Sequence, residues 1–180
     1  MRRFTAAHKD DLLGKIADTA TRRLTDAGQI DAVKDFIRRY YVHCPIQDIY
    51  EESPDNLFGA AFSHWQLASV RPEGVARVRV YNPRLDDHGW RCERTIIEIV
   101  TDNMPFLVDS LTAEMNERDL AVHLVIHPVL NVRRDGKGRL VEVRDPASGK
   151  APVDAAMDDV GEESFIHLQI NRQPDELLNQ

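Results

Sequence analysis

The residues best suited to chemistry lie in one short polar segment between a dense apolar run and an amphipathic stretch. Thr101, Asp102 and Asn103 carry short side chains that accept hydrogen bonds from the first amides of a helix. Pro105 suits a first helical turn, where a missing N–H costs nothing. Amides at a helix start, together with the helix dipole, can hold a carboxylate. The sequence therefore predicts either a simply capped helix or a ligand site at a strand-to-helix corner, formed by Asp102, Asn103, Met104, Pro105 and Phe106.

Two other patterns suggest chemistry less specifically. His123 and His127 would share one face of a strand, where they are either metal ligands or solvated and packing histidines. No third ligand accompanies them at a recognisable spacing, so no metal site is predicted. Asp102 and Asp109 flank the expected helix start, either as paired carboxylates for acid–base catalysis or as a cap and an exposed acid. The second interpretation of the two acids is favoured.

Motifs for catalysis and for nucleotide binding are missing from the sequence. It contains no GxGxxG, GxxxxGK[ST] or GxSxG pattern, and no cysteine beside a plausible base. Cys44 and Cys92 lack metal-site spacing and are interpreted as reduced thiols of a cytoplasmic protein. No catalytic residue and no cofactor is therefore predicted within this chain.

Composition restricts the class of protein further. The chain has 180 residues, of which 42% are hydrophobic and 29% charged, which is typical of a soluble globular protein. Its formal net charge of -7 argues against nucleic acid as a partner, because such binding needs a basic footprint. No apolar run approaches the roughly 20 residues of a membrane span, so no membrane partner is expected.

The elements that must position the corner follow from hydrophobic periodicity. The run from Ile96 to Val100 is rich in β-branched residues and predicts a buried strand. Apolar residues at helical spacing then predict a helix over 105–118. Val122, Leu124 and Ile126 alternate and predict a strand over 120–128, placed at a sheet edge because Pro128 removes a ladder donor.

Before residue 74 the periodicity is helical. We expect a helix over 10–27 with Gly28 as its C-cap, a second helix capped by Asp31, and a third opening at Ser53-Pro54. The third helix carries a broad apolar arc and should contact both the other helices and the following domain. The expected domains are a helical subdomain, 1–73, and a sheet domain, 74–180.

Further strands complete the sheet domain. Residues 75–81 alternate as a half-buried strand, and 164–171 alternate again. Asp135-Gly136-Lys137-Gly138 predicts a protruding hairpin, and 145–163 reads as a mobile loop. A last helix begins at Pro174 and the sequence stops within about two turns of it, so a fragment of a longer protein is expected. The fold class predicted is α+β.

Long stretches of the sequence resemble the N-terminal region of the large bacterial NAD-specific glutamate dehydrogenases. They are FIRRYYVHCPIQDIYEESPDNLFGAAFSHWQLASVRPEGVARVRVYNP, IEIVTDNMPFLVDSLTAEMNERDLAVHLVIHPVLNVRRD and ESFIHLQINRQPDELL. The resemblance implies an ACT-like regulatory region of a cytoplasmic enzyme that deaminates glutamate to 2-oxoglutarate. NAD would then be a cofactor of the parent enzyme alone. The implied partners are an amino-acid effector, the rest of the parent chain and further copies in a homo-oligomer.

The ACT resemblance bears directly on the corner. Its usual pattern of acid, proline, glycine and aliphatic helix start is matched by Asp102, Pro105, Leu107 and Val108, but Phe106 stands where the glycine is expected. That glycine lets a bound amino acid approach the backbone. Two functions stay open: an amino-acid sensor, or a structural and oligomerisation module with a vestigial site.

The resemblance also implies an ACT-like, ferredoxin-like fold in a variant ββαββα order with helices on one face. In this topology 164–171 lies centrally beside 95–101, with 75–81 on the other side of 95–101 and 120–128 at the edge.

Overall fold

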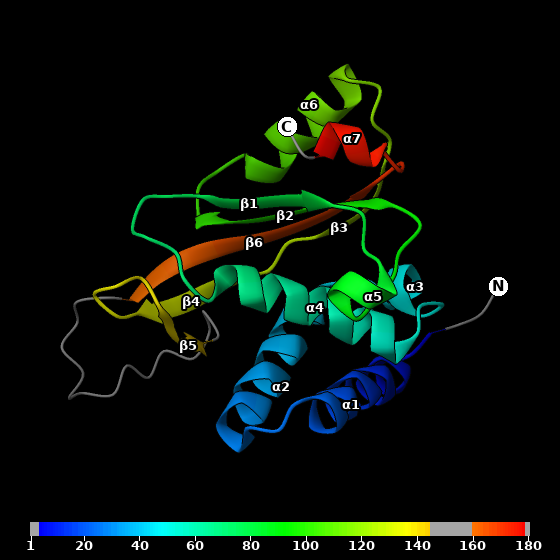
Figure 1. The fold of residues 1–180 in the computed structure, drawn as a ribbon. Coiled ribbons are helices and arrows are strands. Elements are labelled where there is room, and N and C mark those ends of the chain that lie inside the picture. The colour runs from blue at the N-terminus through cyan, green and yellow to red at the C-terminus, as the bar shows by residue number, and fades with distance from the viewer. Residues whose placement is uncertain (1–3, 145–159, 179–180) are drawn as a thin grey trace.

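The computed structural model describes residues 4–144 and 160–178 (Figure 1). No helix in these two ranges combines the length and the apolar character that crossing a membrane requires. The helices are α1 (Ala6–Arg23), α2 (Ala27–Tyr41), α3 (Ile46–Ile49), α4 (Pro54–Ala68), α5 (Leu85–His88), α6 (Leu107–Glu117) and α7 (Asp175–Leu178). The strands are β1 (Arg77–Tyr81), β2 (Thr95–Asp102), β3 (Val122–Ile126), β4 (Val129–Arg134), β5 (Leu140–Arg144) and β6 (Val160–Ile170).

All strand pairs in the described residues are antiparallel and belong to one sheet. Its order is β1-β2-β6-β4-β5, and β3 also pairs with β6. The central position of β6 beside β2, the place of β1 on the other side of β2 and the edge position of β3 confirm the predicted topology. The α+β fold class is confirmed as well. The ββαββα order holds with two additions, the short helix α5 between β1 and β2 and the β4–β5 hairpin between β3 and β6.

The sheet separates two apolar layers (Figure 1). On one face lie α6 and α7, and the helices α1, α2 and α4 cover the other. Ile97, Ile99, Ile166, Leu168 and Ile170 pack toward α6, whose own apolar residues are only half-buried. On the opposite face Phe165, Val100 and Ile126 join the helices in one continuous core. The face of the sheet that packs against α1, α2 and α4 is therefore buried far more completely than the face that packs against α6.

Helix α4 is the element that joins the helices to the sheet. Its Ser53 cap accepts a hydrogen bond from the Asn56 amide at 3.1 Å, and Pro54 occupies its first turn, both as predicted. The helix contacts α1 and α2 on one side and β1 and β2 on the other. The prediction that its broad arc touches two surfaces is therefore confirmed, and most of that arc is buried within this chain.

A close approach within this layer gives a prediction about stability. A Cβ atom added at Gly59 of α4 would lie 2.3 Å from the Trp90 Cβ, whereas one added at Gly14 of α1 would meet no described atom within 4 Å apart from its own helix backbone and chain neighbours. Alanine normally stabilises a helix interior relative to glycine. We expect Gly59→Ala to destabilise the chain by about 1–3 kcal/mol through overpacking. Gly14→Ala, the matched control, should stabilise it by about 0.5–1 kcal/mol. Urea unfolding of both variants measures the contrast, and equal effects would contradict the contact.

Two predicted helix boundaries were wrong. Helix α1 ends at Arg23, and Gly28 lies inside the first turn of α2 instead of capping α1. The cap of α2 is Asp26, not Asp31, because the Asp26 carboxylate accepts from the Gln29 amide at 2.7 Å.

Three strand predictions also need correction. Residues 75–81 were predicted to alternate as a half-buried strand, but most of β1 is exposed: Val78 is 57% exposed, while Arg79 and Tyr81 face α4. The β4–β5 hairpin does not protrude, because β4 pairs with β6. The loop predicted over 145–163 is strand from Val160 onward, and its remaining part, 145–159, lies outside the described residues.

Strand β3 contains a bulge that the alternation did not predict. Its register against β6 shifts between Val122 and Leu124, so His123 is an extra residue. Val122 therefore packs in the α6 layer, whereas Leu124 and Ile126 face the helices. The predicted common face of these three residues was wrong.

Candidate functional site

The predicted corner lies where β2 passes into α6. All five predicted residues, Asp102 to Phe106, are consecutive and exposed. Helix α6 begins at Leu107, two residues later than predicted, so Pro105 lies in the turn before it. Apolar residues of the first turns, among them Leu107 and Leu111, pack against the sheet and fix the direction of the helix. The corner is thus an open surface turn on a fixed helix.

Phe106 has an unusual backbone conformation. Its φ is 64°, in the left-handed region that favours glycine, which is the residue expected here from the ACT pattern. Its ring is 75% exposed, so it lies outside the turn instead of filling it. Phe106 is the N-cap residue of α6, and within residues 4–144 and 160–178 no side chain caps the first amides of the helix. These amides and the helix dipole therefore remain available to a carboxylate.

The sequence suggested that Asp102 caps α6, but in the structure it does not. Its carboxylate accepts a hydrogen bond from the Arg71 guanidinium at 2.6 Å. Asn103 is held against β6: its amide donates to the Glu162 carbonyl at 2.9 Å, and its side-chain oxygen accepts from the Ser164 hydroxyl at 2.9 Å. Because Pro105 has no N–H, the backbone donors of this turn besides Asn103 are the amides of Met104 and Phe106.

The charges around the corner are mainly acidic. Asp102 and Glu162 lie at the ends of the paired strands, and Asp109 lies in the first turn of α6. Acids close to a helix N-terminus compete with a bound carboxylate for its positive potential, but they favour an ammonium group. A zwitterionic ligand, with its carboxylate on the helix amides and its ammonium near Asp102, suits this arrangement better than an anion does.

Below the corner lies a buried ionic group that the sequence did not predict. The Glu163 carboxylate accepts from Arg71 at 2.8 Å and from two nitrogens of Arg134 at 2.7 and 2.8 Å. Arg134 also donates to the Ala68 carbonyl at 2.8 Å. These contacts join the end of α4, the β4–β5 hairpin and β6, and Arg71 extends them to Asp102. The corner is therefore connected to the interior through charged side chains.

A second buried polar cluster lies between α4 and the sheet. Glu98 accepts from Arg79 at 2.6 Å and from the Tyr81 hydroxyl at 3.0 Å. His64 donates from Nε2 to the Ile99 carbonyl at 3.1 Å, and in the neutral ring its Nδ1 accepts from the Tyr40 hydroxyl at 3.0 Å. Alternation placed His167 and Glu98 in strands, but nothing in the sequence indicated that they meet.

His167 lies directly opposite Glu98 across the β2–β6 pair. It is fully buried, and neither ring nitrogen has a hydrogen-bond partner in the part of the chain that the structure describes. Burial lowers the pKa of His64 to about 3 and that of His167 to about 4. Both histidines are therefore uncharged at neutral pH. Under acid conditions, keeping them uncharged lowers the stability of the folded chain.

Comparison with known proteins decides the family. A model of the family described as "Glutamate dehydrogenase, ACT1 domain" matches residues 36–180. The chain belongs to this family. It is 34% identical to the NAD-specific glutamate dehydrogenase of Halomonas elongata over 162 residues, which cover 90% of this chain and 10% of that protein. It is 32% identical to that of Pseudomonas aeruginosa over 170 residues, covering 94% and 10%.

This ACT1-family chain thus spans about a tenth of the length of the curated relatives it matches. No solved structure matches it.

The structure does not assemble the other candidate residues, the two histidines and the two cysteines, into a site among the described residues of this ACT1 domain. His123 is exposed and His127 is half-buried, and no group of three metal-ligating side chains occurs among residues 4–144 and 160–178. Burial raises the pKa of the Cys44 thiol to about 11, and burial also raises that of Cys92. A high thiol pKa leaves little thiolate at neutral pH, so neither cysteine is activated as a nucleophile.

The strained corner residue gives a direct prediction. Phe106→Gly should raise the free energy of unfolding by about 1 kcal/mol, because glycine adopts a positive φ without strain and little ring burial is lost. Asp119, with φ 56°, provides the matched control at the other end of α6, where Asp119→Gly should also stabilise. Urea unfolding measures both variants. A loss of stability in Phe106→Gly would mean that the exposed ring makes contacts of its own.

Proposed function

We propose that this chain is a regulatory module of a cytoplasmic NAD-specific glutamate dehydrogenase. The parent enzyme oxidatively deaminates L-glutamate to 2-oxoglutarate with NAD, and the module itself does not catalyse. The observation that carries the proposal is the match of the ACT1 family model to residues 36–180, which the 32–34% identical dehydrogenases support. The catalytic residues and the NAD site then belong to other parts of the parent.

The non-catalytic part of the proposal has a simple test. The 180-residue chain is incubated with L-glutamate and NAD while the absorbance of NADH is followed. No NADH should form at any protein concentration. NADH formation that scales with the amount of chain would contradict the proposal, and the full-length parent serves as the positive control.

The regulatory part of the proposal assigns an amino-acid effector to the corner. Its carboxylate would take hydrogen bonds from the amides of Met104, Phe106 and the first turn of α6, and its ammonium would lie near Asp102. The uncapped helix start and the exposed Phe106 ring both support this placement. The Asp102–Arg71–Glu163 connection gives such a ligand a physical route to the sheet and the helical layer. An effector acts allosterically only if it binds two states of the parent unequally.

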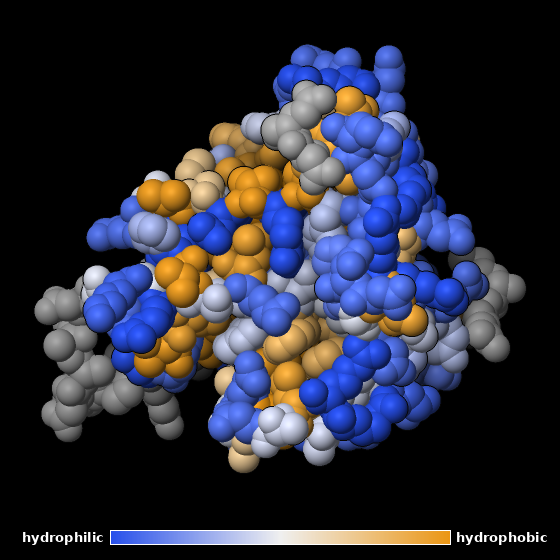
Figure 2. All heavy atoms as spheres, viewed as in Figure 1, coloured by the Kyte–Doolittle hydropathy of each residue, from blue (hydrophilic) through white to orange (hydrophobic). Residues whose placement is uncertain are grey.

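The alternative function is a structural module that joins subunits and binds nothing small. One surface favours it specifically. β1 is an edge strand, and its valines Val78 and Val80 are exposed beside their partners Ile99 and Ile97, which belong to the α6 layer. Figure 2 shows hydrophobic surface, in orange, over the sheet below α6. Edge strands with exposed apolar residues pair readily with other chains. The broad apolar arc of helix α4 is largely buried within this chain, so it offers little surface for such a contact.

Sedimentation tests this alternative directly. Self-association through β1 predicts a mass that rises with protein concentration, and Val78→Lys should return the chain to a monomer. Val141→Lys, at a comparably exposed valine of β5 on the opposite edge of the sheet, is the matched control and should leave association unchanged. A monomer at every concentration would oppose self-association of this chain.

A further inference from the structure

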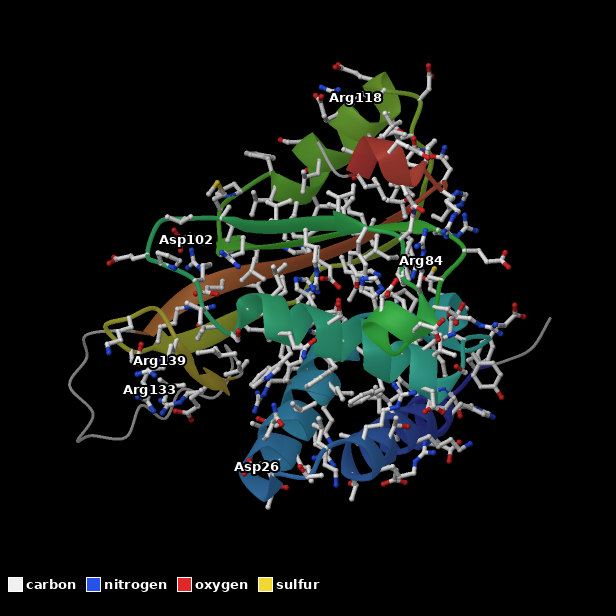
Figure 3. All side chains as sticks on the ribbon, viewed as in Figure 1. Asp26, Arg84, Asp102, Arg118, Arg133 and Arg139 are labelled. Carbon is white, nitrogen blue, oxygen red and sulfur yellow. The ribbon has the colours of Figure 1, made fainter. Side chains whose placement is uncertain are left out.

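A cavity of about 230 Å³ opens at the end of β1, between α5 and α7. Figure 3 shows Arg84 in this region, well apart from Asp102 at the corner. Tyr81 and His88 form part of its lining, together with two apolar and four polar residues: Val80, Leu178, Asn82, Arg84, Asp87 and Asp175. Its volume lies somewhat below the roughly 300–1,000 Å³ of typical ligand sites, which limits it to small molecules.

Asn82 holds the wall of this cavity in place. Its side chain is buried, and its Nδ2 donates to the Gln173 carbonyl at 3.0 Å and to the Asp175 carboxylate at 2.5 Å. Its Oδ1 accepts from the Thr95 hydroxyl at 2.6 Å. The end of β1, the start of β2 and the segment entering α7 are thereby fixed to one another. A ligand would meet walls that are already arranged, which lowers the entropic cost of binding.

The cavity presents charges of both signs. The Arg84 guanidinium donates to the Asp175 carboxylate, and Asp87 adds a second exposed acid. Hydrogen bonding from Asn82 lowers the pKa of Asp175, so it is ionised at neutral pH. Both partners of the Arg84–Asp175 pair are about half exposed, and exposed ion pairs contribute little to stability. A ligand with a carboxylate and an ammonium group could therefore replace each partner at small cost.

We propose that this cavity binds a zwitterionic α-amino acid with a short aliphatic side chain. The carboxylate pairs with the Arg84 guanidinium in a two-point contact. The ammonium lies between Asp87 and Asp175, and the aliphatic side chain packs on Val80 and Leu178. This second site rests on the proposed function only for its class of ligand, because it uses none of the corner residues. A ligand here would join α5 to α7 across the end of the sheet.

The test uses amide chemical shifts of the ¹⁵N-labelled 180-residue chain. L-Valine is titrated beside isobutylamine, which lacks the carboxylate, and 3-methylbutanoate, which lacks the ammonium. L-Valine should shift amides within 80–88 and 175–178 in a saturable manner, and each half-molecule should bind at least tenfold more weakly. Arg84→Ala should weaken L-valine at least tenfold. Arg118→Ala removes an arginine from an equally exposed ion pair on α6 and should leave the affinity unchanged.

The outcomes separate this site from the corner. Saturable shifts confined to residues 102–108 and unaffected by Arg84→Ala would overturn the cavity site and leave the proposed function intact. Binding of isobutylamine as tight as that of L-valine would overturn the role of Arg84. No shift within 80–88 at any concentration of L-valine would overturn the cavity site altogether. Absence of binding by every amino acid anywhere on the native chain would overturn both the cavity site and the regulatory part of the proposed function.

Discussion

Replacement of Glu163 by alanine is expected to lower the free energy of unfolding by about 3–5 kcal/mol, because removal of one partner leaves buried charges without compensation. Glu163 and Arg71 are each only 4% exposed at the side chain, and Arg134 is 10% exposed. Two guanidinium groups would then remain in the interior with one carboxylate, Asp102, at the edge. Glu163 also lies in β6, the strand that pairs with β2, β3 and β4, so the loss reaches the centre of the sheet.

Urea unfolding followed by tryptophan fluorescence measures this loss. Glu163→Gln keeps the shape and one acceptor oxygen and should cost less than Glu163→Ala, so it remains measurable if the alanine variant does not fold. Glu114→Ala is the control, because Glu114 is also paired with an arginine but lies exposed on α6. If Glu163→Ala cost no more than Glu114→Ala, the buried ionic group would contribute nothing to the fold.

The second large effect is a loss of stability in mild acid. The pKa of His64 is lowered to about 3 and that of His167 to about 4, while an unfolded histidine titrates near 6.5. Below pH 6.5 the unfolded chain therefore binds protons that the folded chain does not. The stability from these groups is complete above that pH and declines as the pH falls toward 4. Each histidine contributes a slope of about 1.4 kcal/mol per pH unit.

Urea unfolding between pH 7.5 and 5 measures the slope. Burial also lowers the pKa of His127, so this histidine adds to the slope. The pKa of Asp135 is lowered to about 2 and that of Glu142 is lowered as well, so neither acid contributes to the slope in this pH range. His167→Leu should remove the contribution of one titrating histidine from the slope. It should also raise stability at pH 5, since it removes two ring nitrogens that have no hydrogen-bond partner among the described residues. His123→Gln, at an exposed position of β3, is the control. A slope unchanged by His167→Leu would contradict the buried, neutral state of this histidine.

The sequence predicts those parts of the fold that depend on local patterns. The apolar stripe of Val33, Phe36, Ile37, Tyr40 and Tyr41 is the buried stripe of α2, and the Ser53 cap opens α4. The resemblance to ACT sequences implied the order of β1, β2, β6 and β3. Each of these features rests on residues close together in the chain or on a pattern shared with relatives.

What could not be predicted depends on residues far apart in the chain. Arg71 and Glu163 are 92 positions apart, and neither carries a local sign of its partner. The extra residue His123 in β3 breaks alternation without any glycine or proline to indicate it. Asp102 looked like a cap because caps are recognised by type and position, whereas Arg71 binds it from another element. At Phe106 the missing glycine indicated an unusual position, but only the backbone angle shows how the chain tolerates it.

Calorimetric titration of the 180-residue chain with a panel of amino acids decides whether this ACT1 domain is an amino-acid-responsive module. We expect saturable binding of at least one amino acid, weakened by Asp102→Ala when the corner is occupied and by Arg84→Ala when the cavity is. Asp109→Ala, at an exposed acid of α6, should matter less than Asp102→Ala. If the native chain binds none of the panel and binding appears only in Phe106→Gly, the corner is a vestigial site. That result would contradict the regulatory proposal and support the structural one.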